Sequence, residues 1–201
     1  MLARGVHDNY TDCGMQAIIE GKEWTEEALM ALPRDGRKYE LLEGELVVSP
    51  TGVQHGYISS RLLAALLEFA LKHRLGLVVD SSTGFRLKTG DCLSPDASFV
   101  RRERLEKELT QKFFPGAPDL AVEVLSPGER PAAIGKKLEA YFADETRLAW
   151  VINPKDQTVR VHHSPRRSKT LRAGDCLEGE DLLPGFTFPV AALFALPDFG
   201  S

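Results

Sequence analysis

The chain has 201 residues, of which 43% are hydrophobic and 27% charged, a balance typical of globular proteins that excludes disordered and fibrous classes. Its 25 basic and 29 acidic residues give a net charge of −4, which argues against nonspecific coating of nucleic acid but is compatible with a local basic face. The longest strongly apolar stretches run about a dozen residues, too short for a membrane span.

The beginning of the chain has no periodic pattern. We therefore interpret residues 1–23 as an N-terminal tail and residues 24–201 as a single domain. Thr25 precedes two acidic residues, so it is predicted to cap a short helix that ends before Pro33. Residues 39–48 then predict two strands joined by a glycine turn.

The remainder of the chain alternates between helical and extended patterns. Residues 57–75 form the clearest helix, because apolar side chains recur every three or four positions. A second helix is predicted over residues 132–143, and residues 182–196 predict a turn followed by a short apolar helix that caps the core. The charge-rich residues 101–111 are a helix or a loop. Strands are predicted at residues 77–79, 84–87, 96–100, 119–125, 148–152 and 159–163, so the sequence indicates one α/β domain.

One acidic residue stands inside an otherwise apolar strand. Glu123 lies in the run Ala-Val-Glu-Val-Leu, whose other members favour burial. A lone buried carboxylate costs several kcal/mol, so a cation is expected to meet it. A structural salt bridge satisfies this requirement, and so does the role of a ligand to Mg²⁺.

A second acid supports the metal alternative. Asp96 follows a proline at the start of another apolar strand. If the two strands pair, Asp96 and Glu123 converge at one end, and two neighbouring carboxylates need a proton or a divalent cation between them. Asp119 shares the face of Glu123 but lies about 13 Å away along the strand, so it cannot share the same ion.

A lysine on the following helix completes the constellation. Lys137 and Tyr141 lie one turn apart on a helix that we expect to pack back across the same sheet. From there the lysine can stabilise an attacking hydroxide or a developing charge on phosphorus. The alternative for Lys137 is a solvent-exposed position, as we expect for Lys136 beside it.

Several segments in the same order resemble the Uma-type putative restriction endonucleases of the PD-(D/E)XK nuclease superfamily. The resemblance covers about residues 24–194 and is carried by residues 39–46, His55, and residues 94–96, 118–127, 137–141, 150–154 and 183–186. It implies a restriction-endonuclease-like α/β core, a mixed sheet flanked by helices. It also implies that Asp96, Glu123 and the carbonyl of Val124 hold Mg²⁺.

The resemblance further implies an acid from the N-terminal element, which we place at Glu40, where it would hold a second ion or a metal-bound water. Strand alternation puts Glu40 on the opposite face from Glu43 and Glu45, and the choice among the three rests on the resemblance. The lysine that the superfamily usually carries two residues after the second acid is replaced here by Leu125. The family supplies its lysine from the following helix, which matches Lys137.

Other polar residues have open interpretations. His55 precedes the long helix and either contacts the site or has a capping or surface role. His162 and His163 are adjacent in a strand, so they point to opposite faces and do not bind one metal together. Tyr141 and Trp150 are interpreted as core residues. The basic residues between 159 and 174 form a solvated loop in our interpretation, with contact along a phosphate backbone as the alternative.

These observations predict a Mg²⁺-dependent endonuclease that hydrolyses phosphodiester bonds of DNA, with Mn²⁺ able to substitute. Cutting both strands needs two sites, so we expect a homodimer. We expect no membrane association and no organic cofactor. Three cysteines without paired spacing fit the reducing cytoplasm. The alternatives are an inactive nuclease-fold module that binds nucleic acid or oligomerises, a glycosidase with paired carboxylates, and a structural oligomer.

Overall fold

The computed structural model describes residues 17–19, 24–32, 38–49, 52–105, 112–127, 129 and 131–197. Most of the predicted tail and Pro33 therefore lie outside the described residues. Inside the tail range, Ala17–Ile19 forms strand β1, which pairs antiparallel with strand β3 (Glu45–Ser49). None of the helices in these ranges is long and apolar enough to cross a membrane.

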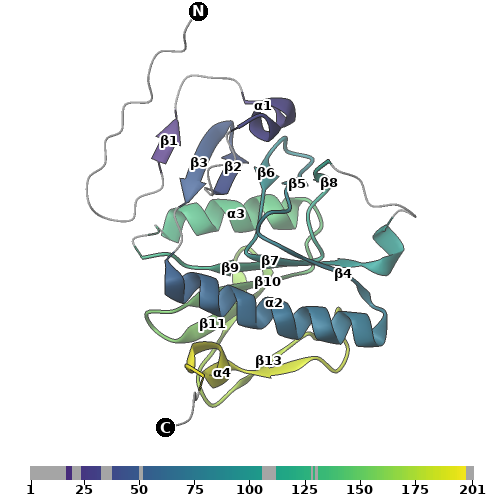
Figure 1. Ribbon diagram of the computed structural model, residues 1–201, viewed down its shortest axis with the longest axis vertical. Helices are drawn as coiled ribbons and strands as arrows, with labels where there is room; N and C mark the ends of the chain where they lie inside the picture. Colours follow the sequence, from purple (N-terminus) through teal and green to yellow (C-terminus); the bar gives the residue numbers. More distant parts are fainter. Residues whose placement is uncertain are drawn as a thin grey trace, which may run out of the picture.

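A mixed sheet forms the centre of the molecule (Figure 1). Its six strands stand in the order β12-β11-β10-β9-β7-β4, and only the β9–β10 pair is parallel. The parallel pair is joined by helix α3 (Pro131–Ala143), as a crossover connection requires. The strands are β4 (Gly76–Asp80), β7 (Ala97–Arg101), β9 (Leu120–Val124), β10 (Leu148–Asn153), β11 (Thr158–Ser164) and β12 (Arg167–Leu171).

Helices cover both faces of this sheet, and strand alternation decides which side chain meets which helix. Val122 and Val124 pack in the core on the side of helix α2 (Val53–His73). Ala121, between them, packs with the core on the side of α3. Glu123 must therefore also face α3. The predicted fold class, an α/β core with a mixed sheet flanked by helices, is confirmed.

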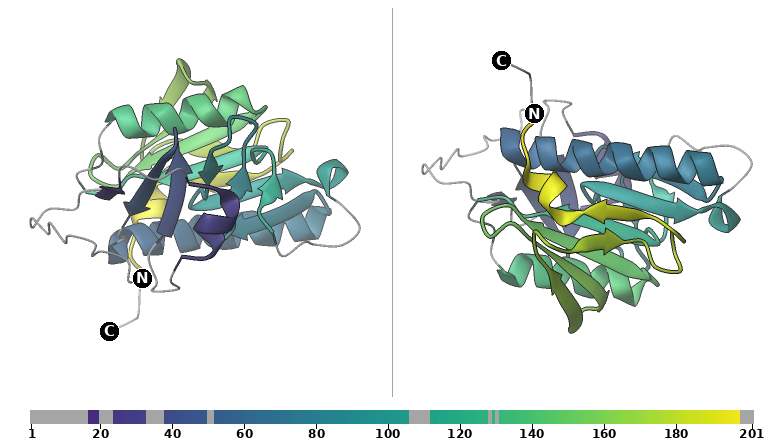
Figure 2. Two further views of the ribbon diagram at one scale, coloured as in Figure 1. Left: turned by 90° about the horizontal axis from the view of Figure 1, so that it is seen from above. Right: turned by 90° about the horizontal axis from the view of Figure 1, so that it is seen from below.

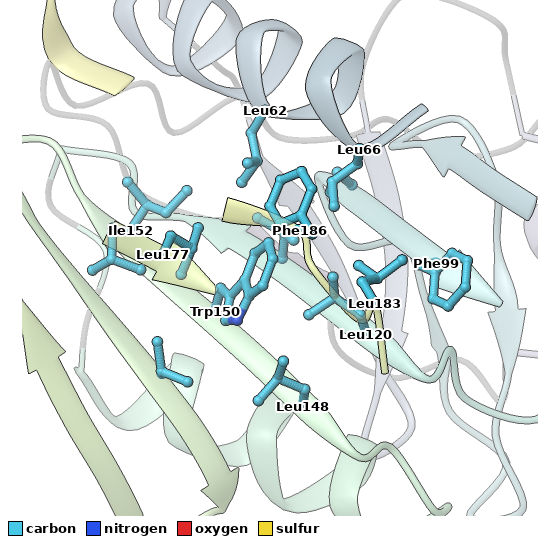
Figure 3. Close-up of a cluster of buried hydrophobic side chains, with 14 of the residues drawn as sticks. Leu62, Leu66, Phe99, Leu120, Leu148, Trp150, Ile152, Leu177, Leu183 and Phe186 are labelled. Atoms are coloured by element: carbon cyan, nitrogen blue, oxygen red, sulfur yellow. The ribbon is translucent and has the colours of Figure 1, made fainter. Parts of the chain in front are cut away.

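The core on the α2 side is closed by the C-terminal segment (Figure 3). Leu183 and Phe186 come from the loop between strands β13 (Cys176–Glu178) and β14 (Thr187–Pro189), and they pack with Trp150 and Leu62. The rings of Trp150 and Phe186 stack with centroids 6.0 Å apart. The short helix α4 (Val190–Phe194) follows, so the predicted C-terminal cap is confirmed, as is the predicted core position of Trp150.

A second, smaller sheet lies on the α3 side of the central sheet (Figures 1 and 2). Its strand order is β1-β3-β2-β6-β5-β8. The predicted strand pair forms β2 and β3, and the predicted short helix forms α1 (Glu26–Met30). The strands not yet placed are β2 (Lys38–Leu42), β5 (Phe85–Arg86), β6 (Cys92–Leu93) and β8 (Phe114–Pro115).

Two expectations differ from the structure. Helix α2 begins at Val53, earlier than predicted, because its first turn carries no apolar stripe that periodicity could detect. The basic run predicted as a solvated loop instead forms part of the β11–β12 hairpin, where Leu171 is buried against the core. The chain passes from β7 into a single 3-10 turn at Arg102–Arg104, and residues 106–111 lie outside the described part.

Candidate active site

The two acids predicted to converge do so at one end of the β7–β9 pair. The strands run antiparallel with Ala97 opposite Val122, so Asp96 lies across from Glu123. The amide of Asp96 donates to the carbonyl of Val122 at 2.8 Å. In return, the amide of Val124 donates to Oδ2 of Asp96 at 2.8 Å. Backbone pairing thus places the carboxylates of Asp96 and Glu123 at the same end of the β7–β9 pair.

Strand β2 brings a third carboxylate to this edge. Glu40 is 1% exposed, and its Oε1 accepts a hydrogen bond from the amide of Ser94 at 2.9 Å. Glu43 and Glu45, the two other candidates, are exposed. The structure therefore brings Glu40, and neither of the others, together with Asp96 and Glu123.

The lysine predicted on the following helix bridges two of these acids. Nζ of Lys137 lies 2.8 Å from Oε2 of Glu40 and 3.1 Å from Oε2 of Glu123, and the lysine side chain is 4% exposed. Lys136, its neighbour, is exposed as predicted and pairs with Glu43. One turn along the helix, the hydroxyl of Tyr141 donates to Oε1 of Glu123 at 2.6 Å.

Tyr141 is both a core residue, as predicted, and a polar contact of Glu123. The residue is fully buried, as predicted for a core position, but its hydroxyl takes part in the polar arrangement. A buried phenol needs a hydrogen-bond partner, and here that partner is a candidate metal ligand. Tyr141 therefore belongs both to the core and to the candidate site.

Two further residues contact Asp96. His55, in the first turn of α2, places Nε2 3.0 Å from Oδ2 of Asp96, which decides between its two interpretations in favour of the site. Lys38, at the start of β2, places Nζ 3.0 Å from Oδ1 of Asp96 and 4.0 Å from Oε1 of Glu40. We refer to the whole set as the buried polar cluster: Lys38, Glu40, His55, Asp96, Glu123, Lys137 and Tyr141.

Sequence reasoning missed Lys38. The signal that could have found it is strand alternation, since Lys38 and Glu40 are two residues apart and must share a face of β2. Tyr39, between them, packs in a separate small core with Leu41. A lysine two positions before a buried glutamate is thus a candidate partner of the same site.

Opposing forces set the ionisation of the acids. Burial raises the pKa of Asp96, but Lys38 and His55 outweigh it, so this pKa lies well below its ordinary value. Burial likewise opposes ionisation of Glu40, yet Lys137 and Lys38 lower its pKa overall. For Glu123, burial dominates the effect of the lysines and raises the pKa to about 7.

The two lysines of the cluster have raised pKa values. Burial lowers the pKa of Lys137, but the carboxylates of Glu123 and Glu40 more than compensate, so the net shift is upward. The same balance, with Glu40 and Asp96 as the compensating acids, raises the pKa of Lys38. Two ammonium groups therefore balance the charges of Glu40 and Asp96, the two acids whose pKa values are lowered.

The donor chemistry of the cluster fits a hard divalent cation. Carboxylate oxygens are the ligands that Mg²⁺ prefers, and Mg²⁺ usually takes only one or two from the protein and keeps several waters. Within the described ranges, no three His, Cys, Asp or Glu side chains are grouped so as to hold a metal by themselves. The carboxylates of Asp96 and Glu123 are oxygen donors of the kind that a hydrated Mg²⁺ takes from a protein.

Some candidate residues lie apart from the cluster, as expected. Asp119 immediately precedes β9, at the end of the strand opposite to Glu123. Arg101 and Arg104 hold its carboxylate there at 2.7 and 3.0 Å. The adjacent histidines His162 and His163 are buried and exposed respectively, which fits opposite faces of β11. Asp119 therefore anchors the far edge of the sheet, away from Glu123.

The chain is similar to known proteins in both sequence and fold. A family model described as "putative restriction endonuclease" matches residues 26–191. A solved structure with a similar fold is a putative nuclease belonging to DUF820 from Anabaena variabilis ATCC 29413. The two align with a TM-score of 0.75 and 20% sequence identity, over 85% of this chain and 97% of that one. No curated protein matches the chain.

Proposed function

Because the chain belongs to the Uma2 family of putative restriction endonucleases, we propose that it is a Mg²⁺-dependent endonuclease that hydrolyses phosphodiester bonds of DNA. The observation that carries the proposal is the position of Lys137, whose ammonium lies within 3.1 Å of both Glu40 and Glu123. A buried lysine held against acids at the end of two paired strands, in a family of nucleases, fits phosphodiester hydrolysis.

In this proposal Asp96 and Glu123 hold Mg²⁺, helped by the carbonyl of Val124. When bound, the ion supplies charge stabilisation for the scissile phosphate and lowers the pKa of a water molecule. Mn²⁺, with similar ligand preferences, is expected to substitute. The amide of Val124 and the ring of His55 both contact Oδ2 of Asp96, which fixes the orientation of that carboxylate.

The remaining residues of the cluster orient groups and carry charge. Lys137 is proposed to stabilise the attacking oxygen and the negative charge that develops on the phosphate. Glu40, fixed by the amide of Ser94, supports the ammonium of Lys137 at 2.8 Å. The hydroxyl of Tyr141 fixes the carboxylate of Glu123 from the other side.

A plasmid-nicking assay tests the proposal directly. With Mg²⁺, the native chain is expected to convert supercoiled DNA to the nicked form, and Asp96→Ala is expected to lose this activity. Asp119→Ala is a matched control, because it removes a buried aspartate at the other end of the same sheet. Equal nicking by the native chain and Asp96→Ala would refute the assignment. Absence of nicking by the native chain would favour an inactive nuclease-fold module.

The proposal includes a homodimer, because cleavage of both strands requires two sites. Leu67 and Leu71 lie one turn apart on α2 and are 40% and 64% exposed. Such apolar positions on the long helix are suited to an interface between two copies. Light scattering of the native chain, with Leu71→Glu for comparison, would measure whether that surface joins two copies.

We further propose a cytoplasmic setting. Among the described residues, Cys92 and Cys176 are free thiols, and Cys176 is exposed. An exposed free thiol persists in a reducing compartment.

A further inference from the structure

Lys38 is a second ammonium group in the buried polar cluster, and its position raises the question of what it does there. Its side chain is 13% exposed, and its Nζ lies 3.0 Å from Oδ1 of Asp96. The same atom lies 4.0 Å from Oε1 of Glu40. Burial of a lysine costs free energy, so a lysine buried beside two acids is expected to compensate their negative charge.

The two oxygens of Asp96 have different partners. Oδ2 accepts from the amide of Val124 and contacts Nε2 of His55. Oδ1 accepts from the ammonium of Lys38. The first oxygen is therefore held by the backbone of β9 and by a side chain of α2, whereas the second is held by a positively charged lysine side chain.

We propose that Lys38 is a positioning residue that occupies Oδ1 of Asp96 as a counter-charge and is displaced from it by the divalent cation. This inference rests on the proposed function, because it takes Asp96 as a ligand of the ion. A lysine and a divalent cation cannot both take the same carboxylate oxygen as a close partner without strong repulsion. Lys38 thus protects the acids from their mutual repulsion when no ion is bound, and it weakens the affinity for the ion.

Lys38 differs from Lys137 in how firmly it is held. Lys137 contacts Glu123 and also Glu40, so Glu40 still holds its ammonium at 2.8 Å if Oε2 of Glu123 binds the ion. Among the described residues, the ammonium of Lys38 makes a single hydrogen bond, to Oδ1 of Asp96, whose other carboxylate oxygen accepts the amide of Val124. Release of Lys38 leaves the remaining contacts of Asp96 intact, which is what an exchangeable counter-charge requires.

Calorimetric titration with Mn²⁺ tests the inference without using activity. Lys38→Met removes the competing charge, so it is expected to bind Mn²⁺ about tenfold more tightly than the native chain, or better. Lys38→Gln also removes the charge but keeps a hydrogen-bond donor, and we expect the same tighter binding of Mn²⁺. This variant replaces Lys38→Met in the test if Lys38→Met folds poorly. Lys38→Arg keeps the charge and should retain the native affinity.

A matched control separates this local effect from the net charge. Lys136→Met removes the same charge from an exposed lysine that pairs with Glu43 outside the cluster. Its affinity for Mn²⁺ is expected to equal that of the native chain. If Lys136→Met tightens binding as much as Lys38→Met, a general charge effect explains the result and the inference fails.

Thermal melting supplies an independent readout. In the presence of a chelator, Lys38→Met is expected to melt at a lower temperature than the native chain, and Mn²⁺ should remove this difference. A purely structural lysine would instead give the same loss with and without Mn²⁺. If the native chain binds Mn²⁺ and neither Lys38→Met nor Lys38→Gln binds it more tightly, the inference is overturned and the proposed function stands. If neither the native chain nor any variant binds Mn²⁺, the proposed function itself fails.

Discussion

The amide of Val124 donates a 2.8 Å hydrogen bond to Oδ2 of Asp96, and this contact joins the two strand ends that carry the candidate metal ligands. The bond lies at the end of the β7–β9 pair, just beyond the register of Ala97 with Val122. Asp96 is thereby fixed next to the backbone that follows Glu123. The orientation of the carboxylate is a consequence of strand pairing and does not depend on a flexible loop.

The neighbouring lysines of α3 provide a matched test of burial. Lys137→Met is expected to destabilise the fold by about 3–5 kcal/mol, because Glu40 and Glu123 remain buried without their cation. Lys136→Met removes an exposed charge and is expected to leave the urea midpoint unchanged. Chemical denaturation of both variants measures the difference. Equal midpoints would show that the acids do not depend on Lys137.

The raised pKa of Glu123 predicts a specific dependence of stability on pH. Between pH 4.5 and about 7, folded Glu123 keeps a proton that the unfolded chain has released. The folded state binds more protons in this window, so the free energy of unfolding falls as the pH rises. Its contribution amounts to about 3 kcal/mol across the window. Glu40 and Asp96 have lowered pKa values, so their stabilisation is lost only at lower pH.

Glu123→Gln isolates this effect. His162, whose pKa is lowered by burial, titrates in an overlapping window with the opposite sign, but it is present in both proteins. The difference between the native chain and Glu123→Gln, measured by urea denaturation at several pH values, should therefore change steadily between pH 4.5 and 7. A constant difference would mean that Glu123 is ionised throughout.

The hydroxyl of Tyr141 is expected to contribute to both stability and activity. Tyr141→Phe leaves Oε1 of Glu123 without its 2.6 Å partner, so we expect a loss of about 1–3 kcal/mol together with slower nicking of plasmid DNA. Tyr57→Phe is the control, because the hydroxyl of Tyr57 donates to the carbonyl of Ala195 at the C-terminal segment. Slower nicking by Tyr57→Phe would imply that the assay reports general stability.

Binding of the ion is expected to stabilise the folded chain. At a concentration 100 times its dissociation constant, Mg²⁺ should add about 2.7 kcal/mol to the free energy of unfolding, if the unfolded chain does not bind it. Thermal melting with Mg²⁺ and with a chelator measures the shift. Asp96→Ala should show none, and an equal shift in this variant would place the bound ion elsewhere.

The positions of Glu123 and Asp96 could be predicted because each is an acidic residue next to apolar residues of a strand. Glu123 is an acid in an apolar strand, and Asp96 stands where a second strand begins, so pairing alone brings them together. Lys137 could be predicted from helical spacing and the short connection to β9. The choice of Glu40 rested on the family resemblance, and its burial distinguishes it from Glu43 and Glu45.

Other parts could not be predicted because they depend on long-range pairing. Strands β6 and β8 have two residues each, too few for any period to appear in the sequence. Strand β5 is equally short but lies inside the strand predicted at residues 84–87. The role of His55 depends on where α2 begins, and no apolar stripe marks that turn. The contact of Lys38 with Asp96 could be predicted only if β2 were known to lie next to Asp96. Strand alternation by itself places Lys38 and Glu40 on one face of β2.

The most direct test is a crystal of the native chain soaked in Mn²⁺, with diffraction data collected at the manganese absorption edge. We expect one anomalous peak within coordination distance of carboxylate oxygens of both Asp96 and Glu123, with the ammonium of Lys38 moved away from Oδ1 of Asp96. An anomalous peak at another site, with Asp96 still bound to Lys38 and Glu123 to Lys137, would contradict the metal site on which the proposed nuclease depends.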